Sequence, residues 1–361
     1  MLRVAIVDID TSHGWVLGNY VRATGRARVT HVVDSGLCWP AAHTKRLADA
    51  LGAEVCGAVD ELVGKVDGVL LLGARYDNRL MRAAPLIEAG IPLFLDKPAG
   101  GTVAQIDELG ALIDRGYPLI CGSSMPYCPE VERIARVVQA GAPSALAVFG
   151  CHEYFEHGVH AADIALSVVR APLRRVSWSA FGASELLWVE TDSATQIAIS
   201  VEAAANWCLA ANGVSGNAIA KLNVGFHRDC HYARLARAFV DLCEGKPVPL
   251  GPRWHIEAIR LLIAGARSRE TGRPVDVADL MPADGFDGLR YAEEYADKCR
   301  NSQYPEGTLT PDAEMFTVAP EYAGLPALNR RQRFRMHARD AALHVLGERG
   351  KRVIKKVLRR A

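Results

Sequence analysis

The sequence lacks the features that would assign it to a membrane, to an oxidising compartment or to a metal site. No apolar run approaches the roughly 18 residues that cross a bilayer. No basic segment with a small-residue cleavage site precedes the first apolar strand at Leu2. The nine cysteines are scattered and include no Cys-x-x-Cys pair, which favours reduced thiols over a disulfide framework. We therefore expect a cytoplasmic protein without a signal peptide, a membrane span or a bound metal.

Internal repeats, low-complexity segments and the interleaved basic and aromatic residues of nucleic-acid-binding surfaces are also missing. What remains is an ordinary globular composition of 361 residues, of which 50% are hydrophobic and 23% are charged. A chain of this length buries a sizeable core and commonly forms two domains. We therefore expect two domains and no nucleic-acid partner.

The first third of the chain alternates short apolar strands with helices, which predicts a doubly wound parallel sheet with right-handed crossovers. The strands are continuous apolar runs, as in strands that are covered on both faces. One helix has a predicted capping box formed by Thr102 and Gln105. Strands are predicted at Arg3–Val7, Val29–Val33, Glu54–Cys56, Val69–Leu72, Ile91–Leu95 and Pro118–Gly122, and helices at Trp15–Ala23, Ala41–Leu51, Asn78–Ala89 and Thr102–Arg115.

A lysine follows the fifth of these strands, in the segment Asp96-Lys97-Pro98. Open α/β sheets bind ligands at the carboxyl ends of their strands. Pro98 restricts the backbone of Lys97 and thereby directs its side chain. A solvated lysine at a strand end is the alternative. We expect Lys97 to face a ligand cleft.

The turn after the first strand lacks the three glycines of a dinucleotide-binding fingerprint. Their positions are taken by Asp8, Asp10 and His13. Two carboxylates would repel a pyrophosphate, whereas the hydroxyls of Thr11 and Ser12 can cap a helix and contact a phosphate. Asp34 ends the second strand, where an acid accepts the ribose hydroxyls of NAD and repels the 2′-phosphate of NADP. An aspartate at this position is also a common turn residue.

The second half of the chain contains a helix that is predicted to begin near Gly158 with a histidine in its first turn. His160 and Asp163 lie on one face of it, and Glu156 precedes it, where the helix dipole favours a negative charge. A histidine flanked by carboxylates is suited to acid/base chemistry, with its tautomer set by an acid. A structural histidine on a capped helix is the alternative.

The segments around this helix predict a second domain that combines helices with a run of antiparallel strands. Helices are predicted at Pro129–Gly141, Tyr232–Glu244 and His255–Glu270, and strands at Ser144–Gly150, Arg175–Gly182, Leu186–Thr191, Gln196–Ala204, Trp207–Asn212 and Ala220–Phe226.

Four segments, in order, resemble signatures of the glucose-fructose oxidoreductase / inositol dehydrogenase / MocA-like family. Asp96-Lys97-Pro98 resembles its Glu-Lys-Pro motif, and residues 156–163 (Glu-His-Gly-Val-His-Ala-Ala-Asp) resemble its Asp-x-Gly-x-His-x-x-Asp helix. Residues 239–247 and 271–275 are similar to its closing segments. The resemblance extends from Arg3 to about Val275. It departs at the phosphate turn, at Arg79 in place of a histidine and at Pro126 in place of an arginine.

The resemblance implies a Rossmann domain that holds NAD, with NADP as the alternative. It also implies a second, α+β domain with an open, mostly antiparallel sheet, whose exposed face forms homodimers or homotetramers. It implies hydride transfer at a secondary alcohol or ketone of a sugar, cyclitol or related polyol. His160 would be the acid/base, and Lys97 would contact the substrate hydroxyl and the cofactor ribose. The predicted catalytic residues are Lys97, His160 and Glu156, the cofactor contacts are Asp10, Thr11, Ser12, His13, Asp34, Arg75 and Lys97, and the substrate contacts are Tyr127, Glu156, His157 and Asp163.

The altered phosphate turn supports a second hypothesis, a relative without redox activity. Such a protein would use the same cleft as a lyase, an epimerase or a hydrolase, or only to bind a ligand.

The chain continues past the resemblance with an extension. Residues 276–328 carry scattered aromatics and are expected to wrap over the body, where they cover the cleft or bury an interface. From Asn329 to Ala361, twelve Lys/Arg stand against two acids, so this tail carries about +10 and the rest about −9. We favour a basic helix docked on the acidic body or on a neighbouring subunit over contact with an anionic membrane surface or nucleic acid. The predicted division is a Rossmann domain at 1–123, a substrate and oligomerisation domain at 124–275 and an extension at 276–361.

Overall fold

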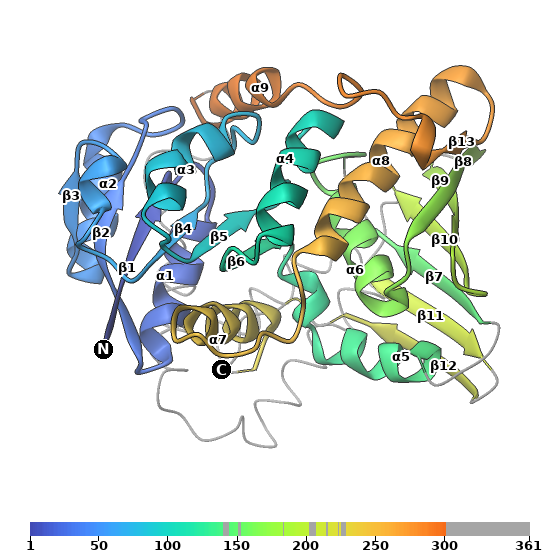
Figure 1. The fold of residues 1–361 in the computed structure, drawn as a ribbon, viewed down its shortest axis with the longest axis horizontal. Helices are drawn as coiled ribbons and strands as arrows, with labels where there is room; N and C mark the ends of the chain where they lie inside the picture. Colours follow the sequence, from blue (N-terminus) through green and yellow to red (C-terminus); the bar gives the residue numbers. More distant parts are fainter. Residues whose placement is uncertain are drawn as a thin grey trace, which may run out of the picture.

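The computed structural model describes residues 1–139, 144–150, 153–182, 184–201, 207–213, 216–222, 224 and 229–300. These residues form two sheets, each covered by helices (Figure 1). The predicted basic tail and the part of the extension after Arg300 lie outside the described residues. Within the described part, no helix combines the length and the apolar character that a membrane span requires.

The first sheet confirms the predicted doubly wound arrangement. Its six strands are all parallel and lie in the order β3-β2-β1-β4-β5-β6. The order reverses between β1 and β4, which leaves a crevice at the carboxyl ends of these strands. The elements are β1 (Leu2–Val7), α1 (His13–Ala23), β2 (Ala27–Val33), α2 (Ala41–Leu51), β3 (Glu54–Cys56), η1 (Asp60–Leu62), β4 (Gly68–Leu71), α3 (Arg79–Glu88), β5 (Leu93–Asp96), α4 (Val103–Asp114) and β6 (Leu119–Gly122).

Local sequence accounts for these elements. Strands β4, β5 and β6 are buried along their whole length because helices cover both sheet faces. The predicted capping box begins α4: the Gln105 N–H donates to Thr102 Oγ1 at 3.3 Å, and the Thr102 N–H donates to Gln105 Oε1 at 3.1 Å.

The second sheet confirms the predicted open, mostly antiparallel arrangement. Its order is β12-β11-β7-β10-β9-β8-β13, and one of the described pairs, β7 with β10, is parallel. Its elements are η2 (Met125–Tyr127), α5 (Pro129–Gln139), β7 (Ala145–Phe149), α6 (Gly158–Val169), β8 (Leu173–Phe181), β9 (Ser184–Thr191), β10 (Gln196–Val201), β11 (Cys208–Gly213), β12 (Gly216–Lys221), α7 (His231–Cys243), α8 (Arg253–Thr271), β13 (Val275–Asp276), η3 (Val277–Asp279) and α9 (Gly288–Arg300).

One predicted strand begins earlier than expected. Residues Ala220–Phe226 were expected to form the last long strand, but β12 runs from Gly216 to Lys221, and residues 223, 225 and 226 lie outside the described residues. Gly213 of β11 pairs directly with Gly216, so residues that have the composition of a turn already belong to the sheet. Gly213, Gly216 and Asn217 are residue types that favour turns, yet all three take part in the pairing of β11 with β12.

Two helices from the second half join the two sheets. Helix α7 packs on α1, and α8 packs on both α4 and α6. The start of α6 is thereby held opposite the carboxyl end of β5, where Lys97 follows.

Candidate active site

A cavity of about 260 Å³ lies where the carboxyl ends of the first sheet face the start of α6. We call it the cleft. Its polar lining comes from five places in the chain: the turn before and at the start of α1, the end of β5, the start of α6, α7 and α9. These residues are Thr11, Ser12, His13, Asp96, Lys97, His157, His160, Tyr232, Tyr291 and Tyr295.

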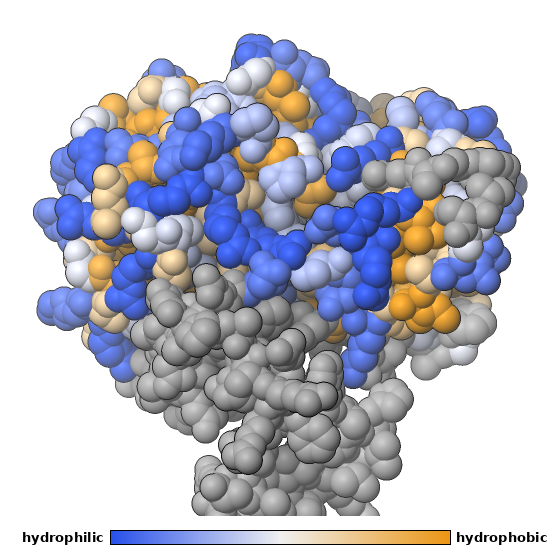
Figure 2. Space-filling model, turned by 90° about the horizontal axis from the view of Figure 1, so that it is seen from below, coloured by the Kyte–Doolittle hydropathy of each residue, from blue (hydrophilic) through white to orange (hydrophobic). Residues whose placement is uncertain are grey.

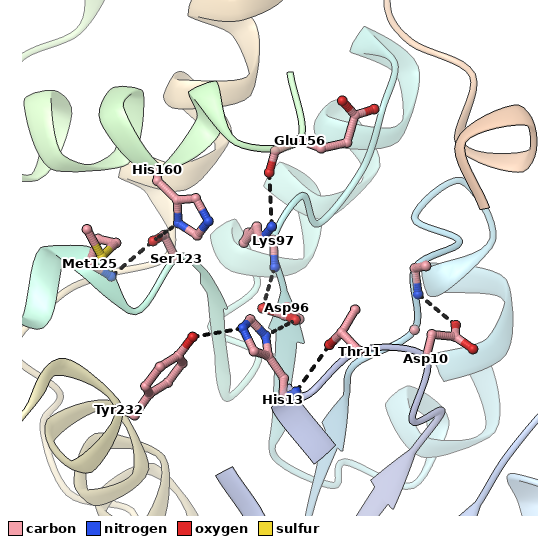
Figure 3. Close-up of polar contacts among 12 residues, drawn as sticks. Asp10, Thr11, His13, Asp96, Lys97, Ser123, Met125, Glu156, His160 and Tyr232 are labelled. Carbon is pink, nitrogen blue, oxygen red and sulfur yellow. Dashed lines mark hydrogen bonds and ion pairs between the residues drawn. The ribbon is translucent and has the colours of Figure 1, made fainter. Parts of the chain in front are cut away.

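Lys97 crosses from the first sheet to the segment before α6. Its Nζ donates to the backbone carbonyl of Glu156 at 2.9 Å (Figure 3). Burial lowers the pKa of Lys97, although the carboxylates of Asp96 and Glu156 oppose the shift. An ammonium group has three donors, so two remain for a ligand.

His160 lies on the opposite wall of the cleft. Its Nδ1 is 2.6 Å from Ser123 Oγ, and that hydroxyl accepts the N–H of Met125 at 3.0 Å (Figure 3). The ring makes no other hydrogen bond with the described residues, which leaves Nε2 for a ligand. Burial and the nearby charge of Lys97 hold the pKa of His160 well below its ordinary value. At neutral pH the imidazole is therefore uncharged and able to accept a proton.

Asp163 contacts a different histidine from the one expected. Its buried carboxylate accepts the Ser123 N–H at 2.7 Å and lies 2.8 Å from Nδ1 of His255. His255 Nε2 in turn accepts the N–H of Ala99 at 3.1 Å. Asp163 thus ties α6 to α8 and to the loop after β5, and it reaches His160 only through Ser123.

The carboxylate of Glu156 points away from Lys97 and His160 (Figure 3). Tyr76 donates to it at 3.4 Å. Tyr127 is buried in η2 and does not line the cleft, and Arg75 pairs with Asp77 at 3.1 Å. Of the predicted catalytic and substrate residues, the structure brings the side chains of Lys97, His157 and His160 together and leaves those of Glu156, Tyr127 and Asp163 outside the lining.

The carboxylates of the phosphate turn do not face the cleft. Asp8 adopts a left-handed backbone conformation (φ 61°), accepts the Ser35 N–H at 2.9 Å and pairs with Arg82 at 3.0 Å. Asp10 is buried and accepts the Ala74 N–H at 2.8 Å. Burial and the neighbouring Asp8 raise the pKa of Asp10 to about 6. The electrostatic objection to a phosphate at this turn is therefore weakened, because neither carboxylate lines the cleft and one is paired.

His13 stands at the position of the third glycine, and each of its two ring nitrogens has a hydrogen-bond partner. Its Nδ1 is 2.5 Å from Asp96 Oδ2 and its Nε2 is 3.0 Å from the hydroxyl of Tyr232 (Figure 3). Tyr232, Ser123, Tyr291 and Tyr295 are site residues that the sequence did not reveal, because no local motif links α7, β6 or α9 to the phosphate turn.

Asp34 lies outside the cleft. Its carboxylate accepts the Thr44 hydroxyl at 2.7 Å and the Ile9 N–H at 3.4 Å. It borders a second cavity, which lies against α2.

The raised pKa of Asp10 predicts a pH-dependent stability difference. An unfolded aspartate ionises near its ordinary pKa, whereas Asp10 in the folded chain keeps its proton up to about pH 6. The free energy of unfolding therefore decreases as the pH rises from about 4 to about 6, and the total decrease is at most about 3 kcal/mol. Asp10→Asn removes this titration. We expect urea unfolding at pH 4.5 and pH 7.5 to show a smaller loss in the variant, and an equal loss in both proteins would contradict the argument.

No protein-family model and no curated protein matches the sequence. Solved structures do match the fold. Scyllo-inositol dehydrogenase from Lactobacillus casei, with NAD(H) and scyllo-inositol bound, is 13% identical with a TM-score of 0.65, and the match covers 77% of this chain and 100% of that chain. Myo-inositol dehydrogenase from Corynebacterium glutamicum is 17% identical with a TM-score of 0.64, covering 76% and 98%. GenD2 of gentamicin A biosynthesis, in complex with NAD, is 20% identical with a TM-score of 0.64, covering 76% and 96%.

These likenesses establish the fold: a Rossmann domain followed by an α/β domain with an open sheet, as in the inositol dehydrogenases. The resemblance drawn from the motifs is thus confirmed at the level of the fold. Nearly all of each solved chain is matched by about three-quarters of this one, so this chain has a part that those folds lack.

Proposed function

We propose that the cleft transfers a hydride between NAD and a secondary alcohol or ketone of a sugar, cyclitol or related polyol. One observation carries the proposal: Lys97 and His160 line the same cleft from opposite walls, at the carboxyl end of a Rossmann sheet. Solved structures with the same fold are named as inositol dehydrogenases, one of them with NAD(H) bound, and the GenD2 structure contains NAD.

In this proposal His160 accepts the hydroxyl proton of the substrate at Nε2, since its lowered pKa keeps the ring neutral. Ser123 holds the ring through Nδ1. Lys97 donates to the same substrate oxygen and stabilises the negative charge that develops there. Bound NAD would accept the hydride at its nicotinamide ring. In the reverse direction His160 returns the proton.

The residues around the phosphate turn fit the cofactor in part. The start of α1, with Thr11 and Ser12, faces the cleft and offers hydroxyls and helix N–H groups to a phosphate. His13 would contribute an imidazole beside them, and Lys97 would contact the ribose. NADP is the alternative cofactor.

The test is a titration of the purified full-length protein with NAD, NADH, NADP and NADPH by calorimetry, followed by a screen of sugars and cyclitols for NADH formation. We expect NAD(H) to bind and at least one polyol to be oxidised. Failure of all four nucleotides to bind would contradict the proposal.

A specific observation favours a second candidate. His13 and Asp96 form a close imidazole–carboxylate pair that also contacts Tyr232, across the cleft from His160. Two sets of proton-transfer groups around one small cleft suit an epimerase or a lyase, which would need no nicotinamide. This candidate predicts turnover of a sugar derivative without any bound or added nucleotide.

The open face of the second sheet is the proposed oligomer interface. A cross-strand row on this face runs through Ile219, Ala210, Ala147, Ala198 and Trp188. The fractional exposure of Ile219 is 79% and that of Trp188 is 51%. Figure 2 shows hydrophobic residues gathered on the side of the second sheet. Exposed apolar surface of this kind marks interaction sites.

We expect light scattering to show a dimer or tetramer. Trp188→Lys should shift the protein to smaller species, because a charge buried in an interface is costly. Met81→Lys, a change at an exposed hydrophobic residue on α3, is the matched control. A monomeric parent protein, or a Trp188→Lys protein of unchanged mass, would argue against this face.

A further inference from the structure

Helix α9 forms a wall of the cleft, although it comes from the extension beyond the resemblance. Tyr291 and Tyr295 line the cavity beside the residues that face them from the phosphate turn and α6. Tyr291 also packs against Tyr76, with ring centroids 5.8 Å apart. Figure 1 shows α9 at the upper edge of the view, above α3 and α4. The described part of the extension thus contributes two side chains to the lining of the cleft.

The end of α9 lies over the route that a dinucleotide would follow. Cys299 is buried, and its thiol lies beside that of Cys38, a few residues after the end of β2. The Arg300 guanidinium donates to the Leu37 carbonyl at 3.4 Å, and the Trp39 indole N–H donates to the Asp10 carbonyl at 2.9 Å. Residues 37–39 and the last turn of α9 are thus packed together at the phosphate turn.

This packing leaves little room for a bound dinucleotide. In a Rossmann fold the cofactor runs from the acid at the end of the second strand, over the phosphate turn, to the switch point of the sheet. Here Asp34 borders one cavity and Lys97 borders another, and α9 helps to enclose the second. That cleft of about 260 Å³ falls below the roughly 300–1,000 Å³ of ordinary ligand pockets. It suits the nicotinamide end of a dinucleotide but not the whole molecule.

We propose that α9 is a lid of the active site, which opens to admit the cofactor and closes with Tyr291 and Tyr295 against the bound ligands. The cofactor part of this inference rests on the proposed function, whereas the opening of α9 does not.

The contacts of α9 are compatible with opening. The fully buried residues of α9 have small side chains at helical spacing, and its larger residues Tyr291 and Tyr295 are only partly buried, so opening exposes less apolar area than a leucine-faced helix would. The fully buried residues are Gly288, Ala292, Ala296 and Cys299. The ion pair between Lys298 and Glu153, at 3.8 Å, is exposed and weak.

The segment before α9 is held more firmly and would act as the fixed end. The Phe286 ring stacks on Phe155 with centroids 3.9 Å apart, and its N–H donates to the Gly101 carbonyl at 2.9 Å. Gly285 has a φ of 150°, and a Cβ there would collide with Gly101. Lids commonly turn about a few residues at the end of an element, here Asp287 and Gly288.

Hydrogen exchange tests the lid without reference to any cofactor. We expect the backbone amides of α9 to exchange faster than those of β1 and β4, since a lid opens without global unfolding. Ala296→Leu, which enlarges the buried face, should speed exchange in α9 and leave β4 unchanged. Protection of α9 equal to that of β4 would overturn the proposal.

A disulfide tests the link to the cofactor. Diamide takes two electrons and two protons from a pair of thiols, and peptide mapping would identify a Cys38–Cys299 bond. We expect the cross-linked protein to bind NADH about tenfold more slowly or worse, because the open fraction falls, and dithiothreitol to restore the rate. Cys299→Ser, treated in the same way, is the control.

The outcomes separate the two proposals. Equal NADH association rates for the cross-linked and reduced proteins would overturn the lid and leave the oxidoreductase intact. If NADH bound neither form, the cofactor assignment would fail, and the exchange rates of α9 would still decide whether the helix opens.

Discussion

Replacing His160 with alanine is expected to lower turnover by about 10²-fold or more, the usual cost of removing a general acid/base. The reason lies in the geometry of the cleft. His160 is held at Nδ1 by Ser123, its Nε2 remains for the substrate, and Lys97 lies on the facing wall. Steady-state rates of polyol oxidation measure the effect. The Michaelis constant should change less than turnover, because the proton transfer belongs to the transition state.

The pH profile gives an independent check on the same residue. The pKa of His160 lies well below its ordinary value, so the base form persists at pH values where an exposed histidine is already protonated. On acidification, turnover should therefore be lost only below pH 6.5, which is the approximate pKa of a free imidazole. Loss of this pH dependence in His160→Ala is expected.

Two further variants test how Ser123 and Lys97 contribute to turnover. Ser123→Ala should lower turnover less than His160→Ala, because the imidazole remains but loses the hydroxyl that orients it. Lys97→Ala should affect both turnover and substrate binding. Near-normal rates in both His160→Ala and Lys97→Ala would remove the basis for the catalytic pair.

The first sheet was predictable because its signal is local. Continuous apolar runs such as Val4–Val7 and Leu93–Leu95, separated by helical segments, have few solutions other than a parallel sheet covered on both faces. The position of Lys97 followed from the same pattern. A charged residue at the carboxyl end of a buried strand has to lie at the ligand edge of the sheet.

The partners of the site residues were not predictable in the same way. Asp163 follows His160 by three residues, which suggested a contact, yet it pairs with His255, 92 positions along the chain. His13 likewise meets Tyr232, 219 positions away. Contacts of this kind depend on how α7 and α8 pack between the sheets, and helical periodicity carries no information about that packing.

The phosphate turn shows how a correct observation led to an incomplete inference. The sequence indicated two carboxylates near a phosphate, which is unfavourable. The structure turns Asp8 towards Arg82 and buries Asp10 against the Ala74 N–H, so neither faces the cleft. Side-chain direction after a strand depends on backbone angles such as the left-handed φ of Asp8, which the sequence does not reveal for a residue other than glycine.

The buried carboxylate of Asp163 contributes both to the stability of the fold and to the geometry of the cleft. It accepts hydrogen bonds from the Ser123 N–H and from His255, and it is 3% exposed. His255 lies on α8 and also holds the loop after Lys97 through Ala99. A buried donor that loses its acceptor costs about 1–3 kcal/mol, and two donors depend on this one group.

Asp163→Ala is therefore expected to lower the free energy of unfolding by about 3 kcal/mol or more, measured by urea denaturation. Asp49→Ala, at an exposed ion pair on α2, should change it by less than about 0.5 kcal/mol and serves as the matched control. Asp163→Asn should fall between the two, because its amide oxygen can accept from only part of the network. Turnover should fall with stability in Asp163→Ala, since Ser123 loses the contact that fixes its backbone beneath His160. An Asp163→Ala protein as stable as Asp49→Ala would show that the packing of α6 against α8 does not depend on this carboxylate.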